Sequence, residues 1–289
     1  MIDISGIPEL QSWIRARRGE GRRIALVPTM GALHEGHLAL VDEARRRAEV
    51  VVMSVFVNPL QFGPHEDLAR YPRDLARDRD LAGRRGVDAL FAPSEAAMYP
   101  AGSSTRVVPG PTAERWEGMA RPGHFTGVLT VVAKLFHLVG PDVACFGRKD
   151  LQQAVLIGQM VRDLDWPIEL AVVPTVREAD GLALSSRNVY LDAEARRSAL
   201  GLSAALRAAH ETWREGERRA GAIEARMRET LALHPALAVE YIAVAEPAGL
   251  EPVTEVDAAT VVAIAGRVGC TRLIDNITLG EGLGRCSAI

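Results

Sequence analysis

Lysine is almost absent from this chain of 289 residues, since only Lys134 and Lys149 are lysines among its 34 Lys and Arg residues. Arginine therefore supplies nearly all of the generic positive surface charge, and coding bias accounts for that excess. A lysine in such a chain suggests a role that arginine cannot fill, and a role that needs a compact ammonium point charge is one explanation. Two lysines could also persist by chance, so the observation is only a first indication.

Cysteines and long apolar runs are also scarce. The three cysteines, Cys145, Cys270 and Cys286, are far apart and lack metal-ligand spacing, and the apolar run around Cys145 predicts a small buried side chain. No apolar run approaches the roughly 20 residues that cross a bilayer, and the first residues lack the regions of a secretory signal. A net charge of −3 argues against general binding of nucleic acid. We therefore predict a cytoplasmic protein with neither a membrane nor a nucleic-acid partner.

Short β-branched runs alternate with helical patterns in the first part of the chain. Strands are predicted at 23–28, 50–57, 88–91, 143–146 and 168–173, and helices from residue 37 and at 67–85, 126–139 and 151–164. The continuous apolar run at 50–57 is typical of a strand covered on both faces. The alternation predicts βαβ units with right-handed crossovers, and hence an α/β fold with a Rossmann-like, doubly wound parallel sheet.

The pattern changes after about Val176. Helices are predicted at 193–215 and 223–234, and strands at 239–245, 261–265 and 272–278. These elements predict a smaller α+β domain. We therefore divide the chain into a larger ligand-binding domain, residues 1–176, and a C-terminal domain, residues 177–289.

The densest group of chemically useful side chains lies at 28–37, between the first predicted strand and its helix. Gly31 and Gly36 permit close approach of the backbone, and the helix start offers unpaired N–H groups to an anion. His34 and His37 could both face that anion. The alternatives are ordinary loop histidines, or metal ligands, which are the weaker interpretation because no third ligand is evident in the motif.

Two further loops follow predicted strands at the same edge of the sheet, where ligands bind to open parallel sheets. Asn58 and Gln61 follow the second strand and could hydrogen-bond a polar substrate, although ordinary turn chemistry is the alternative. Lys149 follows the strand at 143–146, where its ammonium would neutralise phosphate charge that grows during attack at an α-phosphorus. A surface lysine at a helix start is the alternative there.

A fourth loop, at 178–188, contains two hydroxyls and a guanidinium, from Ser185, Ser186 and Arg187. These groups suit a triphosphate, because they supply donors and a bidentate fork. Taken alone, such a loop is common. All four loops belong at one edge of one sheet, however, and together they predict a phosphate-binding site.

These motifs resemble a known set. The segment His34-Glu-Gly-His37 resembles the His-x-Gly-His signature of nucleotidyl transferases and class I aminoacyl-tRNA synthetases, and Leu184-Ser-Ser-Arg187 resembles their second, mobile loop. More specifically, five stretches resemble the pantothenate synthetase family, in the family's order: 28–37, 56–63, 121–127, 146–153 and 174–188. They span most of the first 190 residues, whereas the last hundred residues contain fewer stretches that resemble the family.

The resemblance implies a pantoate–β-alanine ligase, which forms pantothenate, AMP and pyrophosphate from pantoate, β-alanine and ATP through a pantoyl-adenylate. It implies Mg²⁺ as a cofactor and a homodimer in which the small domain closes over the nucleotide-binding one. A nucleotidyl transferase that keeps the nucleotide on its product, and a regulatory nucleotide-binding module without turnover, are the alternatives. Gln61 and Gln153, together with the five stretches, favour ligation.

The resemblance also implies a role for each site residue. His37 is usually assigned as the proton donor, and His34, Lys149 and Arg187 complete the predicted catalytic set. Pantoate would be bound by Gln61 and Gln153, and β-alanine also binds at Gln61. The ATP-binding residues would be Met30, Gly31, Ala32, Leu33, His34, Glu35, Gly36, His37, Gly147, Arg148, Lys149, Asp150, Val176, Leu184, Ser185, Ser186 and Arg187.

Two positions depart from the family's pattern. Arg148 stands where the Gly-x-Lys-Asp turn is more often acidic, which predicts a change in local charge and not a loss of activity. The acidic cluster thought to help hold the metal is altered at 77–80, so the metal ligands are left open. His124 lies in one of the matching stretches, where packing at the start of a helix is as good an interpretation as catalysis.

Overall fold

The computed structural model describes residues 1–64 and 66–284. It divides into two compact units, which are treated separately below. The first comprises Met1–Gly147 and Leu156–Val173, and the second comprises Arg148–Val155 and the chain from Pro174 onward. No sequence pattern indicated that the short segment Arg148–Val155 belongs with the second unit. The predicted division of the chain after residue 176 into two domains stays a prediction.

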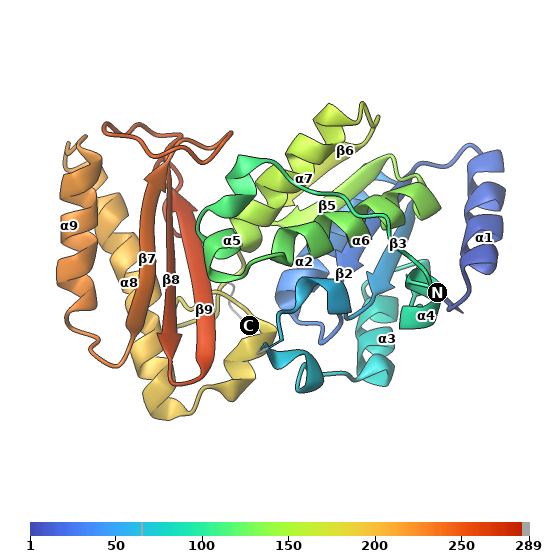
Figure 1. Ribbon diagram of the computed structural model, residues 1–289, viewed down its shortest axis with the longest axis horizontal. Coiled ribbons are helices and arrows are strands. Elements are labelled where there is room, and N and C mark those ends of the chain that lie inside the picture. The colour runs from blue at the N-terminus through green and yellow to red at the C-terminus, as the bar shows by residue number, and fades with distance from the viewer. Residues whose placement is uncertain (65, 285–289) are drawn as a thin grey trace. The chain divides into compact units, whose positions relative to one another are not determined.

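A six-stranded parallel sheet forms the centre of the first unit (Figure 1). In sheet order its strands are β1 (Ile2–Ile4), β4 (Ala89–Phe91), β3 (Val50–Val55), β2 (Ile24–Thr29), β5 (Val143–Gly147) and β6 (Glu169–Val173). All neighbouring strands run parallel, as the sequence predicts. Strand β1 was not predicted, because three residues are too short to carry a readable periodicity.

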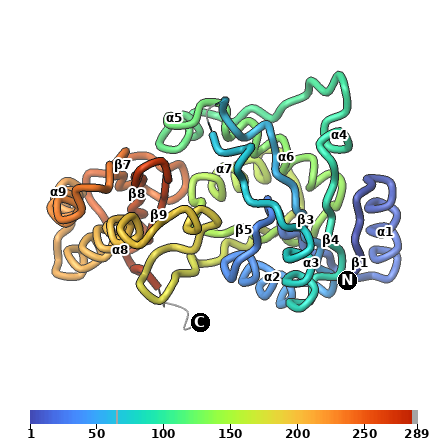
Figure 2. Tube along the Cα trace, turned by 90° about the horizontal axis from the view of Figure 1, so that it is seen from below, coloured from blue at the N-terminus to red at the C-terminus, as the bar shows by residue number. Residues whose placement is uncertain are grey.

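Helices cover both faces of this sheet, as Figure 2 shows for α2 and α3 on one side and α6 and α7 on the other. The helices are α1 (Ile7–Gly19), α2 (Glu35–Arg47), α3 (Leu75–Arg84), α4 (Glu95–Met98), α5 (Glu117–Ala120), α6 (His124–Val139) and α7 (Leu151–Asp163). The predicted helix at 67–85 is wrong at its start. Pro72 disfavours helical backbone at the preceding residue, and Asp74 caps α3 by accepting a hydrogen bond from the Arg77 N–H.

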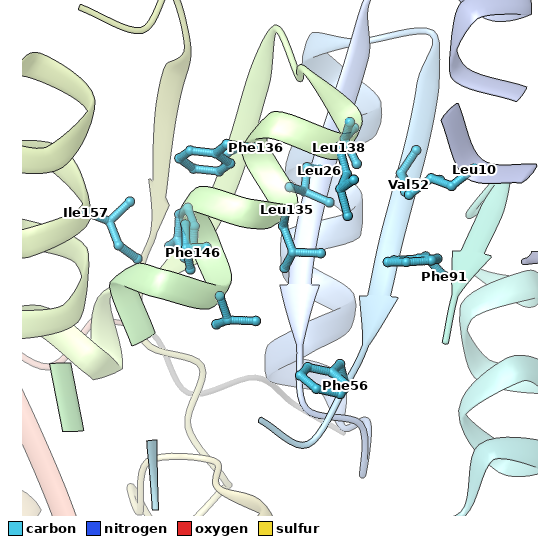
Figure 3. Close-up of a cluster of buried hydrophobic side chains, with 14 of the residues drawn as sticks. Leu10, Leu26, Val52, Phe56, Phe91, Leu135, Phe136, Leu138, Phe146 and Ile157 are labelled. Atoms are coloured by element: carbon cyan, nitrogen blue, oxygen red, sulfur yellow. The ribbon is translucent and has the colours of Figure 1, made fainter. Parts of the chain in front are cut away.

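Successive side chains of the central strands enter two separate hydrophobic clusters. Leu26 and Val52 pack on the face covered by Leu135 and Phe136 of α6 (Figure 3). Val27 and its neighbours pack on the opposite face, with side chains of α2. Because both faces are buried, the strands read as continuous apolar runs, and the predicted doubly wound sheet is confirmed.

Cys145 lies in the cluster on the α2 face and is fully buried, as its apolar surroundings in the sequence predict. Burial raises the pKa of its thiol to about 12, so that a nucleophilic thiolate is not available at neutral pH.

The strand order contains a topological switch point. From β2 the chain continues through β3 and β4 to one side, and later adds β5 and β6 on the other side of β2. In open α/β sheets, ligands bind outside the carboxyl ends of the strands at such a point. The loops that follow β2 and β5 are therefore the expected places for a ligand.

The second unit contains a three-stranded antiparallel sheet and two long helices (Figure 1). In sheet order the strands are β7 (Ala238–Ala245), β8 (Val261–Val268) and β9 (Thr271–Thr278), and the helices are α8 (Ala193–Arg214) and α9 (Ala220–Leu231). Leu206 of α8, Ile223 of α9 and Ile264 of β8 share one core, so the predicted smaller α+β region is confirmed. Within the described residues, no helix combines the length and apolarity needed to cross a membrane.

Candidate active site

Two histidine rings stand together at the start of α2. His34 is the N-cap, and its Nδ1 accepts a hydrogen bond from the Gly36 N–H at 3.1 Å. The Nδ1 of His37 accepts from the His34 N–H at 3.4 Å, and the two ring centroids lie 4.1 Å apart. Because both Nδ1 atoms accept, each neutral ring carries its proton on Nε2. Two imidazole N–H donors therefore stand at a helix N-terminus, where the dipole favours an anion.

The loop before these histidines has an unusual backbone. Gly31 has φ of +81° and Ala32 has φ of +52°, in the left-handed region. A Cβ at Gly31 would lie 2.8 Å from Oδ2 of Asp78 and 2.9 Å from Cγ1 of Val55, so only glycine fits there. For Ala32 this conformation costs about 1–2 kcal/mol, which the surrounding contacts must offset.

Asp78 of α3 supplies those contacts. Its carboxylate is only 1% exposed, and it accepts hydrogen bonds from the N–H of Ala32 at 2.9 Å and from that of Leu33 at 2.8 Å. Two N–H groups in the predicted ATP-binding loop are thus directed at a side chain of the protein. This role was not predicted, because the charged run around Asp78 indicated a solvated helix. The available signal in the sequence was the helical spacing of Asp78 and Ala82, which places both side chains on the buried face of α3.

Asn58 lies just after β3 and caps the 3₁₀ turn Pro59–Gln61. Its Nδ2 donates to Oε1 of Gln61 and to the carbonyl of Gly127, both at 3.1 Å. Its Oδ1 accepts from the Tyr99 hydroxyl at 2.9 Å and from the Leu60 N–H at 3.3 Å. All four hydrogen-bonding positions of this amide are therefore occupied within the protein. The geometry favours a positioning role over the predicted contact with substrate.

Gln61 joins the loops that follow β2 and β3. Its Nε2 donates to Sδ of Met30 at 3.0 Å, while its Oε1 is held by Asn58. The turn around Gln61 sits directly against α6, because Gly127 has no side chain. A Cβ there would lie 2.2 Å from the carbonyl oxygen of Leu60. The first unit thus brings together Met30, Gln61 and the turn that carries Asn58.

His124, at the start of α6, holds the same turn by its backbone. Its Nδ1 lies 2.8 Å from the carbonyl oxygen of Gln61, and its Nε2 lies 3.0 Å from Nη1 of Arg121. Burial, and then the charge of Arg121, lower the pKa of His124 to about 4. The ring is therefore neutral at pH 7, with Nδ1–H donating to Gln61 and Nε2 accepting from Arg121. Of the two interpretations of His124, the structure favours packing at the helix start.

We expect His124 to make stability depend on pH. Its pKa is about 4 in the folded chain and near 6.5 when it is exposed, so the unfolded chain binds more protons between these values. The free energy of unfolding should therefore be fully present above about pH 6.5 and fall by up to about 1.4 kcal/mol per unit as the pH drops toward 4. Urea unfolding at several pH values would measure this, with His124→Asn as the comparison. Parallel pH profiles of the two proteins would contradict the expectation.

Lys149 lies in the second unit, in the 3₁₀ turn Arg148–Asp150 that links β5 to α7. The Asn276 Nδ2 of β9 donates to the carbonyls of Arg148 at 3.0 Å and Lys149 at 2.9 Å. The Nζ of Lys149 lies 3.9 Å from Oδ1 of Asp150. Gln153, the predicted pantoate ligand of this segment, is partly exposed on the first turn of α7.

The loop that contains Leu184, Ser185, Ser186 and Arg187 also belongs to the second unit. The N–H of Leu184 donates to the carbonyl of Val176 at 3.0 Å, which closes the base of this loop. Ser185 caps the short 3₁₀ helix Ser186–Tyr190, because its hydroxyl accepts from the Arg187 N–H at 3.3 Å. Arg177, which was not predicted, is buried beneath the loop and paired with Asp275 of β9.

The predicted site residues thus form two groups. The first unit assembles Met30, His34, His37 and Gln61 at the carboxyl ends of β2 and β3. The second unit assembles the Lys149 turn and the loop through Arg187 around β9. Convergence of both groups on one triphosphate stays a prediction. In the described part of the chain, no three His, Cys, Asp or Glu side chains are grouped so that they could hold a metal ion.

Comparison with known proteins gives consistent matches. The model of a family described as pantoate-beta-alanine ligase matches residues 3–278. A pantothenate synthetase of Moorella thermoacetica is 52% identical over 273 residues, which are 94% of this chain and 96% of that protein. The crystal structure of pantothenate synthetase from Thermus thermophilus matches with a TM-score of 0.92 and 50% identity, covering 96% of this chain and 99% of that one.

A third match is a crystal structure whose description names bound ligands. The crystal structure of pantoate-beta-alanine ligase from Francisella tularensis, described as complexed with beta-gamma ATP and beta-alanine, has a TM-score of 0.78 and 33% identity. The match covers 98% of this chain and 100% of that chain.

Proposed function

Because the chain belongs to the pantoate–β-alanine ligase family, we propose that the two groups of residues described above bind and activate the substrates of that reaction. The enzyme joins pantoate to β-alanine at the expense of ATP, through a pantoyl-adenylate, and releases AMP and pyrophosphate. The observation that carries the proposal is the pair of His34 and His37 rings at the N-terminus of α2, beside a loop that holds Gln61.

In the first step, a carboxylate oxygen of pantoate attacks the α-phosphorus of ATP, and the bond from this phosphorus to pyrophosphate breaks. Gln61 and Gln153 orient the pantoate. The Nε2–H groups of His34 and His37 donate hydrogen bonds to phosphoryl oxygens on which negative charge grows, and this step needs no net proton transfer. This assignment is supported by the tautomers that the backbone N–H groups impose on both rings.

Cationic groups of the second unit complete the proposed ATP site. The ammonium of Lys149 and the guanidinium of Arg187 stabilise charge on the phosphates, and Ser185 and Ser186 supply hydroxyl donors. The remaining predicted ATP contacts are Gly31, Ala32, Leu33, Glu35, Gly36, Gly147, Arg148, Asp150, Val176 and Leu184. In the second step, the neutral amine of β-alanine attacks the acyl carbon, the bond from this carbon to the AMP oxygen breaks, and the nitrogen releases one proton to solvent. Positioning supplies most of the acceleration in both steps, because the protein forms no covalent bond to substrate.

Mg²⁺ is proposed to enter as its complex with ATP. This ion keeps several waters and is usually bound through substrate phosphates and one or two carboxylates. We leave the metal ligands of this chain unassigned. We further propose a cytoplasmic homodimer, for which light scattering should give the mass of two chains.

The test of the proposed chemistry follows labelled pyrophosphate into ATP. Exchange is expected to require pantoate but not β-alanine, because the adenylate forms before the amine reacts. With all three substrates, mass spectrometry should detect pantothenate and free AMP. Exchange that also needs β-alanine would contradict a free adenylate. A product that retains the nucleotide would instead indicate a nucleotidyl transferase.

A further inference from the structure

We infer that two adjacent residues of β9, Asp275 and Asn276, are positioning residues that hold the Lys149 turn and the Arg187 loop in one fixed arrangement. The inference rests on the proposed function, in which both segments bind ATP. Adjacent side chains of a strand point to opposite faces, so one strand can reach two loops at once. All contacts that carry this inference lie within the second unit.

Asn276 holds the turn that carries Lys149. Its side-chain amide uses both N–H bonds, one to the carbonyl of Arg148 at 3.0 Å and one to that of Lys149 at 2.9 Å. These bonds join residues 127 and 128 positions apart in the chain, so no local pattern provides for them. Fixing two successive carbonyls determines the path of the turn, and hence the position of the Lys149 Cα.

The carbonyl oxygen of the same amide indicates why residue 276 is an asparagine. Asn276 is 5% exposed, and its Oδ1 has no hydrogen-bond partner among the described residues. A buried polar atom without a partner is destabilising, because it has lost its hydrogen bonds to water and gained none in the protein. A residue selected only for stability would avoid that cost, whereas one selected for the direction of its two donors would tolerate it.

Asp275 holds the second loop through Arg177. The two side chains form a bidentate pair at 2.6 and 2.8 Å, and they are 2% and 1% exposed. Arg177 also donates to the carbonyls of Gly181 at 3.2 Å and Leu283 at 2.9 Å. A buried pair of this kind contributes little net stability, because desolvation offsets its attraction, but its two parallel bonds fix geometry.

Asn188 closes the loop beyond Arg187. Its Nδ2 donates to Oε1 of Glu178 at 2.7 Å and to the carbonyl of Ala183 at 3.1 Å. Hydrogen bonds of Arg177 and of Asn188 therefore fix the segment that carries Ser185 and Arg187 on both sides. Asn276, whose side chain points to the other face of β9, fixes the Lys149 turn. The cationic groups of both loops therefore hold their positions before ATP binds. This preorganisation reduces the rearrangement that the reaction requires.

The test is Asn276→Leu, which keeps the volume but removes both donors and the unpaired Oδ1. We expect kcat for pyrophosphate exchange to fall at least about tenfold, because Lys149 acts in the transition state, with a smaller change in the KM for ATP. The change in melting temperature should be small, because the loss of the bonds to the two carbonyls is partly offset by removal of the buried, unpaired Oδ1. Glu281→Gln is the matched control, since it removes an exposed ion pair with the Arg148 side chain and leaves both carbonyl bonds intact.

Two results would overturn the inference. One is an Asn276→Leu enzyme with kcat within about threefold of the unchanged protein. The other is a folded Asn276→Leu enzyme whose KM for ATP rises while its kcat is unchanged. If Asn276→Leu does not fold, Asn276→Asp provides the same test, because it keeps the size and replaces the donors with an acceptor. A folded Asn276→Asp enzyme with unchanged kcat would equally overturn it.

A double-mutant cycle separates this inference from the proposed role of Lys149. The kcat for pyrophosphate exchange is measured for Lys149→Ala, Asn276→Leu and the double variant, and each loss is converted to a coupling. If Asn276 acts through Lys149, its substitution should add little once Lys149 is gone, whereas additive losses would contradict the inference. Normal activity of Lys149→Ala would overturn both ideas. An impaired Lys149→Ala beside a normal Asn276→Leu would overturn only the positioning role.

Discussion

Lys149→Ala is expected to lower kcat/KM for adenylate formation by at least about a hundredfold, or ~2.7 kcal/mol of transition-state stabilisation. The reason is electrostatic. Charge grows on the phosphoryl oxygens as pantoate attacks, and a preorganised ammonium stabilises that charge more than it stabilises bound ATP. Lys149→Arg keeps the charge but changes its shape, so we expect it to recover only part of the loss.

Lys134, the other lysine of the chain, provides a matched control. Its Nζ donates to the carbonyl of Met98 and lies 5.8 Å from the centre of the Tyr99 ring. Lys134→Ala should therefore affect stability and leave the kinetics of the folded enzyme within about threefold. Steady-state rates of pyrophosphate exchange would measure both variants. A Lys149→Ala enzyme that keeps kcat/KM within about tenfold, a loss below ~1.4 kcal/mol, would remove Lys149 from the mechanism.

The parallel sheet could be predicted from the sequence because its strands are buried on both faces. The apolar runs at β2, β3 and β5 therefore stand out without knowledge of their partners. Short or interrupted elements could not be predicted in the same way. The three residues of β1 are ordered by pairing with β4, which is distant in the chain. The start of α3 depends on Pro72 and Asp74 and not on the charge pattern that suggested a longer helix.

The candidate site was predictable to the extent that its residues follow strands. His34, Gln61 and Lys149 each stand a few positions after a recognisable apolar run, and the strand order explains why these positions are suited to a ligand. The residues that hold them were not predictable. Asp78 contacts a loop 45 residues away, and Asn276 contacts a turn 127 residues away. Only the folded structure brings such pairs together.

Asp78→Ala is expected to lower both stability and activity. Removal of the carboxylate leaves the N–H groups of Ala32 and Leu33 without their partner in a buried environment, at about 1–3 kcal/mol each. We therefore expect a loss of about 2–6 kcal/mol in the free energy of unfolding. Asp78→Asn retains one acceptor but turns an amide N–H₂ toward a backbone donor, so its loss should be intermediate.

The activity of Asp78→Ala should fall about a hundredfold even where the protein stays folded, because displacement of reacting groups by about 1 Å costs roughly that much. The left-handed backbone at Gly31 and Ala32 would relax without its anchor, and His34 follows two residues later. Asp80→Ala is the control, because Asp80 is exposed on the same helix and its ion pair with Arg84 contributes about 0.5 kcal/mol or less. Denaturant unfolding and steady-state kinetics on the same preparations separate the two effects. A variant with full stability but little activity would show that the carboxylate acts on a ligand and not on the loop.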